Sequence, residues 1–226
     1  MNADFYEIRY CPACGLRYPL TNGHPFGERC PSCLGEAQVV LTQAFPPLPN
    51  REMDGVKDAS RLSILLDNIR SIWNVGSIFR TSDGLGVSKL YLCGITPTPE
   101  NEAMRKTSLG AEETVTWEYS RNALETAKKL KSEGCMLIAL EQDTRSVPVT
   151  QFSILDSQSP ILILGNEITG VDPKILDLCD HIVHIPMRGQ KRSLNVEVAF
   201  AIAAFSLIQT KSHLDKLTGK SSHNHW

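Results

Sequence analysis

The chain has 226 residues, of which 42% are hydrophobic and 21% charged, and its formal net charge at pH 7 is −2. This composition excludes a disordered chain and fits one ordinary globular domain with a small appendage. The charge excludes a generally basic surface, so any contact with nucleic acid must use local patches. No apolar run approaches the ~20 residues that cross a bilayer, and the first residues do not resemble a signal peptide, so we expect a cytoplasmic protein.

Two close pairs of cysteines stand near the N-terminus, in "CPACG" and "CPSCLG". Each Cys-x-x-Cys can turn two thiolates toward one point, and two such turns complete a tetrahedron around Zn²⁺ with no position left for water. This spacing predicts a structural zinc site. Two redox-active motifs are the alternative, but neither pair opens a helix in a βαβ unit. His24 is a candidate spare ligand, although an exposed loop histidine fits better. The predicted ligands are Cys11, Cys14, Cys30 and Cys33.

Composition divides the chain into four parts. Residues 1–45 hold the cysteine pairs and are predicted to form a zinc ribbon. The linker, 46–58, begins in a proline-rich stretch that favours extended backbone. The main domain is expected over 59–212, and a flexible tail over 213–226.

Strands and helices alternate after the linker. Apolar runs predict strands over 61–68, 88–94, 113–119, 135–141, 160–166 and 181–186. Helical patterns predict helices over 73–86, 121–134, 172–179 and 194–209. We expect Asn74, Asp172 and Ser193 to cap three of these helices. Short strands separated by helices indicate an α/β fold with a mostly parallel sheet, in which ligands bind at the carboxyl ends of strands.

Three segments carry polar residues that a simple core does not need. "NVGSIFR" contains Asn74 and Arg80, and "LILGNEITG" places Glu167 directly after a buried strand. "IPMRGQKRSLNVEVAF" puts the densest positive charge of the chain between a strand and a helix. Taken singly, these segments could be a surface arginine, an ordinary turn and a solvated basic loop.

In this order and spacing, the three segments resemble the SpoU/TrmH family of RNA ribose 2′-O-methyltransferases, within the SPOUT superfamily, over roughly residues 61–209. The resemblance implies a C-terminal trefoil knot that holds S-adenosylmethionine. It also implies that tRNA or rRNA is the substrate, and that the protein is a homodimer whose interface includes the closing helix. One departure from the family pattern is Glu197, where several relatives have a small residue. The implied catalytic residues are Asn74, Arg80, Glu167, Ser193 and Asn195. The implied cofactor-binding residues are Gly165, Ile185 and Leu194, with Leu140 and Met187 as neighbours.

The resemblance explains why positive charge is concentrated in the basic segment. We expect Arg188, Lys191 and Arg192 to bind RNA phosphates beside the cofactor, with Arg105 and Lys106 extending the patch. The family's proposed agent for activating the ribose hydroxyl corresponds to Arg80. A guanidinium is protonated at ordinary pH, so Arg80 could act either as the base or as a clamp on the phosphate and the developing alkoxide.

Three other functions remain open on the sequence. The chain could be an RNA-binding zinc-ribbon protein with a catalytically silent knot, or a SPOUT enzyme that methylates a base. A nucleotide-dependent oxidoreductase is a weaker alternative, because "DGLG" is too short for a dinucleotide-binding fingerprint and lies inside a predicted helix.

Overall fold

The computed structural model describes residues 5–21, 28–45, 62–154 and 159–217, with side chains as far as residue 209. The chain divides into two compact units, Met1–Asp54 and Gly55–Trp226. The predicted linker, His24 and the last nine residues of the predicted tail (218–226) lie outside the described residues.

The N-terminal unit is a small antiparallel sheet with two cysteine turns. Its strands are β1 (Phe5–Tyr10), β2 (Arg17–Thr21) and β3 (Gln38–Ala44), in the order β2-β1-β3. One cysteine turn follows β1 directly, and the other precedes β3. Cys11 and Cys30 are fully buried, whereas every residue of β3 is exposed. The cysteine turns therefore form much of this unit's interior.

The larger unit is built on a seven-stranded sheet in the order β6-β5-β4-β9-β7-β10-β8. Every pairing in this sheet is parallel, which confirms the predicted α/β fold class. The central strands β4 and β9 are buried at every position, as expected for parallel strands covered on both faces. The strands are β4 (Ser63–Asp67), β5 (Lys89–Cys93), β6 (Trp117–Ser120), β7 (Met136–Leu140), β8 (Val147–Pro148), β9 (Pro160–Leu164) and β10 (His181–His184).

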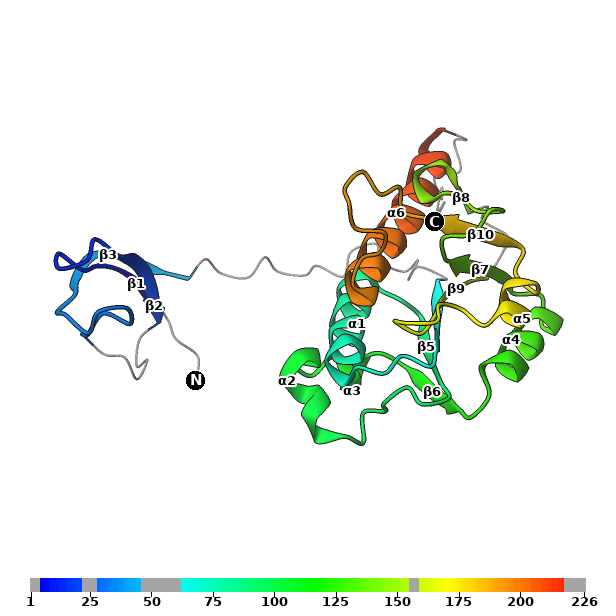
Figure 1. The fold of residues 1–226 in the computed structure, drawn as a ribbon, viewed down its shortest axis with the longest axis horizontal. Coiled ribbons are helices and arrows are strands. Elements are labelled where there is room, and N and C mark those ends of the chain that lie inside the picture. The colour runs from blue at the N-terminus through cyan, green and yellow to red at the C-terminus, as the bar shows by residue number, and fades with distance from the viewer. Residues whose placement is uncertain (1–4, 22–27, 46–61, 155–158, 218–226) are drawn as a thin grey trace, which may run out of the picture. The chain divides into compact units, whose positions relative to one another are not determined.

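Helices cover both faces of this sheet (Figure 1). The helices α1 (Ile72–Leu85) and α6 (Val196–Leu217) lie together on one face. The opposite face carries α4 (Ala123–Ser132) and α5 (Pro173–Leu176). Short helical turns complete the unit: η1 (Glu102–Met104), α2 (Arg105–Ser108), α3 (Ala111–Thr114) and η2 (Val149–Gln151). Among the described helices, none combines the length and apolar character that a membrane span requires.

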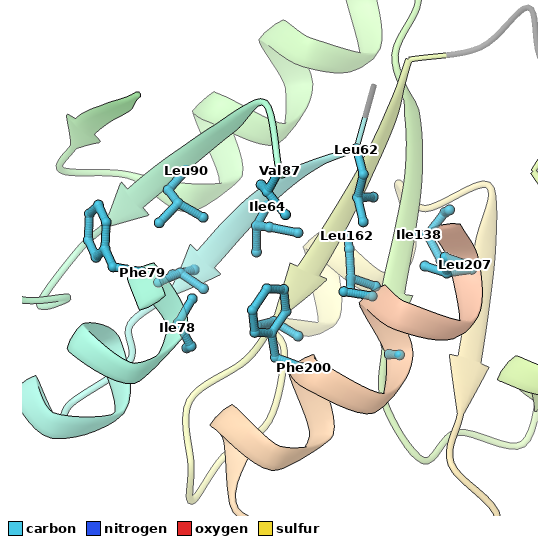
Figure 2. Packing of buried hydrophobic residues seen from close by; sticks show 14 of the residues in the cluster. Leu62, Ile64, Ile78, Phe79, Val87, Leu90, Ile138, Leu162, Phe200 and Leu207 are labelled. Atoms are coloured by element: carbon cyan, nitrogen blue, oxygen red, sulfur yellow. The ribbon is translucent and has the colours of Figure 1, made fainter. Parts of the chain in front are cut away.

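The core has two layers because successive side chains of each strand face opposite sides. Ile64 of β4 packs toward α1 and α6, and the next residue, Leu65, packs toward α4 and α5. Figure 2 shows the first layer, in which Phe79 of α1 and Phe200 of α6 lie against side chains of β4, β5, β7 and β9. Both phenylalanines are fully buried, so they fix the two helices on the sheet.

Several boundaries differ from the sequence prediction. Helix α1 is capped by Ser71, whose Oγ accepts a hydrogen bond from the backbone amide of Asn74, so Asn74 is not the cap. Helix α6 begins after Asn195, whose Oδ1 accepts from the amide of Glu197 at 2.8 Å, so the predicted cap Ser193 is wrong. Asp172 caps α5 as predicted, accepting from the Lys174 amide.

Three further differences concern length. The strand predicted over 113–119 begins only at Trp117, because the preceding residues form α3. Helix α6 continues to Leu217, past the predicted end at 209. The two-residue strand β8 was not predicted. The trefoil knot implied by the resemblance stays a prediction.

Candidate functional site: a pocket at the carboxyl ends of the parallel strands

A pocket of about 550 Å³ lies where the chain leaves β9, β7 and β10, which are neighbours in the sheet. The carboxyl ends of parallel strands meet at one edge, and loops there can surround a ligand. Its lining residues are Asn74, Leu140, Glu141, Gln142, Leu164, Gly165, Asn166, Glu167, Ile168, Gly170, His184, Ile185, Met187, Arg192, Ser193, Leu194, Asn195, Val196 and Ala199.

A hydrogen-bonded set of side chains forms one wall of the pocket. Asn74 donates from Nδ2 to Glu167 Oε1 at 3.1 Å, and its Oδ1 accepts from Asn195 Nδ2 at 3.1 Å. The same glutamate accepts from the backbone amides of Arg70 (2.9 Å) and Ser71 (3.1 Å). Two polar residues from distant parts of the sequence, Glu167 and Asn195, are therefore tied to the start of α1.

The charge of Glu167 is stabilised by these donors. Burial alone raises the pKa of its carboxyl, but the backbone amides of Arg70, Glu167 itself and Ser71, and the Asn74 side chain, outweigh it and lower the pKa. The side chain is therefore a charged acceptor fixed in place by at least three donors.

The turn after β9 requires glycine at two positions. At Gly165, an added Cβ would collide with the backbone of Gly170 and Val171. Gly170 has φ of 73°, and an added Cβ would collide with the carboxylate of Glu141, which accepts from the Val171 amide at 3.1 Å. The backbone of Asn166 and Gly170 exchanges two hydrogen bonds of 3.0 and 2.9 Å. A compact, preformed turn is the result.

The basic segment from 185 to 195 closes the pocket on another side. It has no regular secondary structure, and it is attached to the loop after β7 by a bond of 2.6 Å from Gln142 Nε2 to the carbonyl oxygen of Arg192. Ile185, Met187 and Leu194 of this segment line the pocket. The pocket therefore has apolar surfaces as well as the polar wall.

Ten residues singled out from the sequence line this one pocket. They are Asn74, Leu140, Gly165, Glu167, Ile185, Met187, Arg192, Ser193, Leu194 and Asn195. Arg80 lines a separate hollow of about 470 Å³ instead, and Arg188 and Lys191 are exposed outside the lining. Arg105 does not extend a free basic patch, because its guanidinium lies 3.7 Å from Glu112 and 4.0 Å from Glu113.

Some pocket residues were missed by the sequence analysis. Glu141 and Gln142 follow β7, and His184 ends β10. The rule that ligands bind at carboxyl ends of parallel strands could have found all three. His184 Nδ1 is bonded to Ser146 Oγ at 2.8 Å, and Ser146 donates its own proton to the carbonyl of Asp143, so the ring donates from Nδ1.

The cysteine turns of the N-terminal unit bring four sulfur atoms together. Sγ atoms of Cys11, Cys14, Cys30 and Cys33 all lie within 4.8 Å of one another. Across the cluster, Cys11 and Cys33 are 3.5 Å apart and Cys14 and Cys30 are 3.7 Å apart. Zinc bonds of about 2.3 Å in a tetrahedron place sulfurs roughly 3.8 Å apart, so the geometry fits this metal.

The pKa values of the thiols differ within the cluster. Burial raises the pKa of Cys30, but backbone amides of Cys33 and Ser32 and the neighbouring thiols outweigh it and lower the pKa to about 7. The amide of Leu16 lowers the pKa of Cys14, but hydrogen bonds with the other cysteines and burial raise it to about 12. Four sulfurs this close cannot all be thiolates without positive charge between them.

The larger unit has a pocket at the strand ends of a parallel sheet. The Asn195–Asn74–Glu167 set forms one wall of this pocket, and a basic segment closes it. These features are typical of a ligand-binding domain. The model of the SpoU rRNA Methylase family matches residues 61–205. The chain therefore belongs to this family.

Named relatives show the same likeness. The chain is 27% identical to a tRNA (guanosine(18)-2′-O)-methyltransferase of Borreliella burgdorferi, covering 71% of this chain and 72% of that one. It is 26% identical to the 23S rRNA (guanosine-2′-O-)-methyltransferase RlmB of Vibrio vulnificus, covering 73% of this chain and 66% of that one. The chain thus spans slightly less than two thirds of the Vibrio protein.

Solved structures agree on the fold. The TrmH/SpoU tRNA modifying enzyme of A. aeolicus superposes with a TM-score of 0.60 at 26% identity, over 70% of this chain and 77% of that one. An AdoMet-bound rRNA methyltransferase of Sinorhizobium meliloti gives 0.59 at 25% identity, over 66% of this chain and 56% of that one.

Proposed function

We propose that this protein transfers a methyl group from S-adenosylmethionine to a ribose 2′-hydroxyl of tRNA or rRNA. The observation that carries the proposal is the Asn195–Asn74–Glu167 set on the wall of the strand-end pocket. Family membership and the names of the relatives support the reaction and the substrate class.

The pocket suits a nucleoside that has both apolar and polar parts. Its volume of about 550 Å³ lies within the ordinary range for small ligands. We propose that Leu140, Ile185, Met187 and Leu194 contact the flat apolar face of the adenine base. The backbone of Gly165, which also lines the pocket, would bind the polar edge of the base. Bound there, S-adenosylmethionine would supply an activated methyl group.

The polar residues have separate roles in this proposal. Glu167 and Asn74 hold the start of α1, and Asn195 with Ser193 positions the ribose. Arg80 is exposed and has no hydrogen-bond acceptor among the described residues, so its guanidinium is available for an RNA phosphate. We favour the clamp over the base: Arg80 would stabilise the developing alkoxide while the proton leaves to phosphate or water.

The basic segment would bring RNA to the pocket. Arg188, Lys191 and Arg192 are all exposed, and Arg192 also lines the pocket. Each contact with a phosphate would weaken as salt rises. The bond between Gln142 and the Arg192 carbonyl ties this segment to the loop after β7. The C-terminal trefoil knot implied by the resemblance is also part of the proposal.

A homodimer is part of the proposal. Helix α6 exposes Val198, Ile202 and Phe205. Their separation by three or four positions makes one apolar stripe, and a second copy of the chain would remove it from water. Phe205 is 54% exposed, so the gain from covering it is substantial.

A structural zinc ion is proposed for the N-terminal unit. Cys11, Cys14, Cys30 and Cys33 would complete its coordination, which leaves no open position for catalysis. Zinc would also neutralise the thiolates and hold the two cysteine turns together. The division into ribbon (1–45), linker (46–58), methyltransferase domain (59–212) and tail (213–226), and the cytoplasmic location, stay predictions.

The experiment that tests the proposed function uses the full chain. Calorimetry with S-adenosylhomocysteine measures the affinity of the pocket for the cofactor product. Incubation with labelled S-adenosylmethionine and mixed tRNA and rRNA measures methyl transfer to RNA. Leu194→Asp should lose cofactor binding, whereas the control Ile95→Asp, which alters a side chain that is 64% exposed outside the pocket, should not. RNA binding without transfer would indicate a silent RNA-binding protein, and a methylated base would indicate a base-modifying enzyme; either result contradicts the proposal.

A further inference from the structure

The outer side of α1 carries an aromatic and basic surface next to the pocket. Trp73, Ser77 and Arg80 follow one another at intervals of four and three residues, so they share one side of the helix. Trp73 is 48% exposed although it is the largest apolar side chain on α1. The ammonium group of Lys106 lies 5.9 Å from the centre of its ring.

A hollow of about 470 Å³ adjoins this side of α1. Its two cations are Arg80 and Lys106, and its single acid is Glu197, which accepts a hydrogen bond from Thr81 at 3.3 Å. The remaining lining is hydroxyl groups. The lining residues are Ser77, Arg80, Thr81, Lys106, Thr107 and Glu197. Such a hollow has the charge and donors to bind a phosphate.

The hollow is held in a fixed position beside the pocket. Gly76 lies directly under α2: an added Cβ would collide with Thr107 Oγ1 and lie 2.9 Å from the Met104 carbonyl. This close contact places Lys106 next to the ring of Trp73. Asn195 and Glu197, two positions apart at the start of α6, line the pocket and the hollow respectively. The two sites therefore share a wall.

We propose that Trp73 and this hollow bind one nucleotide of single-stranded RNA that flanks the methylated nucleotide. The base stacks on the exposed indole, and its phosphate lies between Arg80 and Lys106. The inference rests on the proposed function. Indole stacking accepts any base, and cations on the same surface bind the backbone, which is the usual arrangement in proteins that bind single strands.

Charge favours RNA over a protein partner as the occupant. The hollow has two positive charges, from Arg80 and Lys106, and one negative charge, from Glu197. Lys106 forms no ion pair within the described part of the chain. Covering two like charges with a second copy of the same surface would bring equal charges together, which is unfavourable. A dimer that buries Trp73 is the alternative, and the experiment distinguishes it.

The experiment compares full-length variants by anisotropy of a labelled, short single-stranded RNA. Trp73→Leu should weaken binding about ten-fold, whereas Trp73→Phe, which keeps a ring for stacking, should stay within about three-fold. Lys106→Ala should lower the salt dependence of binding by about one phosphate contact. Lys129→Ala removes the same charge from α4 on the opposite face and should change neither quantity.

Two parallel measurements make the result decisive. Binding of S-adenosylhomocysteine should be unchanged in Trp73→Leu, because Trp73 does not line the pocket. Light scattering should give the same oligomeric state as the unaltered protein; a shift to monomer would overturn the inference in favour of a dimer contact. RNA affinity and methylation equal to the unaltered protein would also overturn it while leaving the proposed function intact. An unaltered protein that neither binds nor methylates RNA would refute the proposed function itself.

Discussion

Asn195 donates its side-chain amide to the Oδ1 of Asn74 at 3.1 Å, and this contact joins the first residue before α6 to the first turn of α1. The same Asn195 caps α6 through its Oδ1. One side chain therefore fixes both the helix that closes the domain and the wall of the pocket. Its two functions can be separated by mutation.

Asn195→Ala should remove both contacts. We expect the free energy of unfolding to fall by about 1–2 kcal/mol and cofactor affinity to fall with it. Asn195→Ser keeps a capping oxygen but is too short to reach Asn74, so stability should largely recover while affinity stays low. Denaturant titration and calorimetry with S-adenosylhomocysteine measure the two effects. Equal affinity in Asn195→Ser and the unaltered protein would show that the Asn74 contact is unimportant.

Glu167 gives a prediction on pH. Its folded pKa lies below the unfolded value of about 4.3, so its stabilisation is complete above that pH and is lost as the pH falls through the folded pKa. The unaltered protein should therefore be more stable than Glu167→Gln near pH 7, and the difference should shrink as the pH falls below the unfolded pKa of Glu167 and through its lower folded pKa. Urea denaturation at a series of pH values measures this difference. A constant difference over the whole range would be inconsistent with a charged acceptor.

Gly170→Ala should distort the turn that shapes the pocket. The positive φ and the collision with Glu141 predict a loss of about 1–3 kcal/mol in stability, together with weaker cofactor binding. Gly189→Ala is the matched control, because no atom lies within 4 Å of its added Cβ and its φ is not positive. If thermal denaturation shows the same small change for both variants, the turn is less constrained than its geometry indicates.

Leu34 adopts a strained conformation in the second cysteine turn. Its φ is 61°, and the equivalent position of the first turn is Gly15, with φ of 75°. Leu34 is 65% exposed, so its side chain contributes little burial. Leu34→Gly should stabilise the N-terminal unit by about 1 kcal/mol and raise its zinc affinity, whereas Leu34→Ala, which keeps the strain, should not. Competition with a chelator tests this, and equal behaviour of the two variants would refute it.

The sequence predicted the sheet better than it predicted the contacts around the pocket. Buried parallel strands such as β4 and β9 appear as continuous apolar runs, and Asp172 before Pro173 marks the start of α5. In contrast, β3 is exposed along its whole length and carries no burial pattern, since it belongs to a unit built around cysteines.

The sequence did not predict which side chains the pocket residues would contact. Asparagine is a common helix cap, but the side chain of Asn74 donates a hydrogen bond to Glu167, which is 93 positions away in the sequence. Ser71 performs the capping instead. Arg80 lies in the neighbouring hollow and not in the pocket lining, because its place on α1 is set by helical periodicity. Local patterns identify elements, whereas long-range bonds decide which side chains meet.

The most direct test of the central claim is to locate the transferred methyl group in RNA. Labelled methyl groups from S-adenosylmethionine should appear in alkali-resistant dinucleotides of tRNA or rRNA, because a 2′-O-methyl group blocks cleavage at that ribose. Arg80→Ala should reduce this signal about 100-fold or more, and Arg80→Lys nearly as much, while Arg121→Ala should leave it unchanged. Label that stays alkali-labile, or a normal rate in Arg80→Ala with the cofactor bound, would contradict the account.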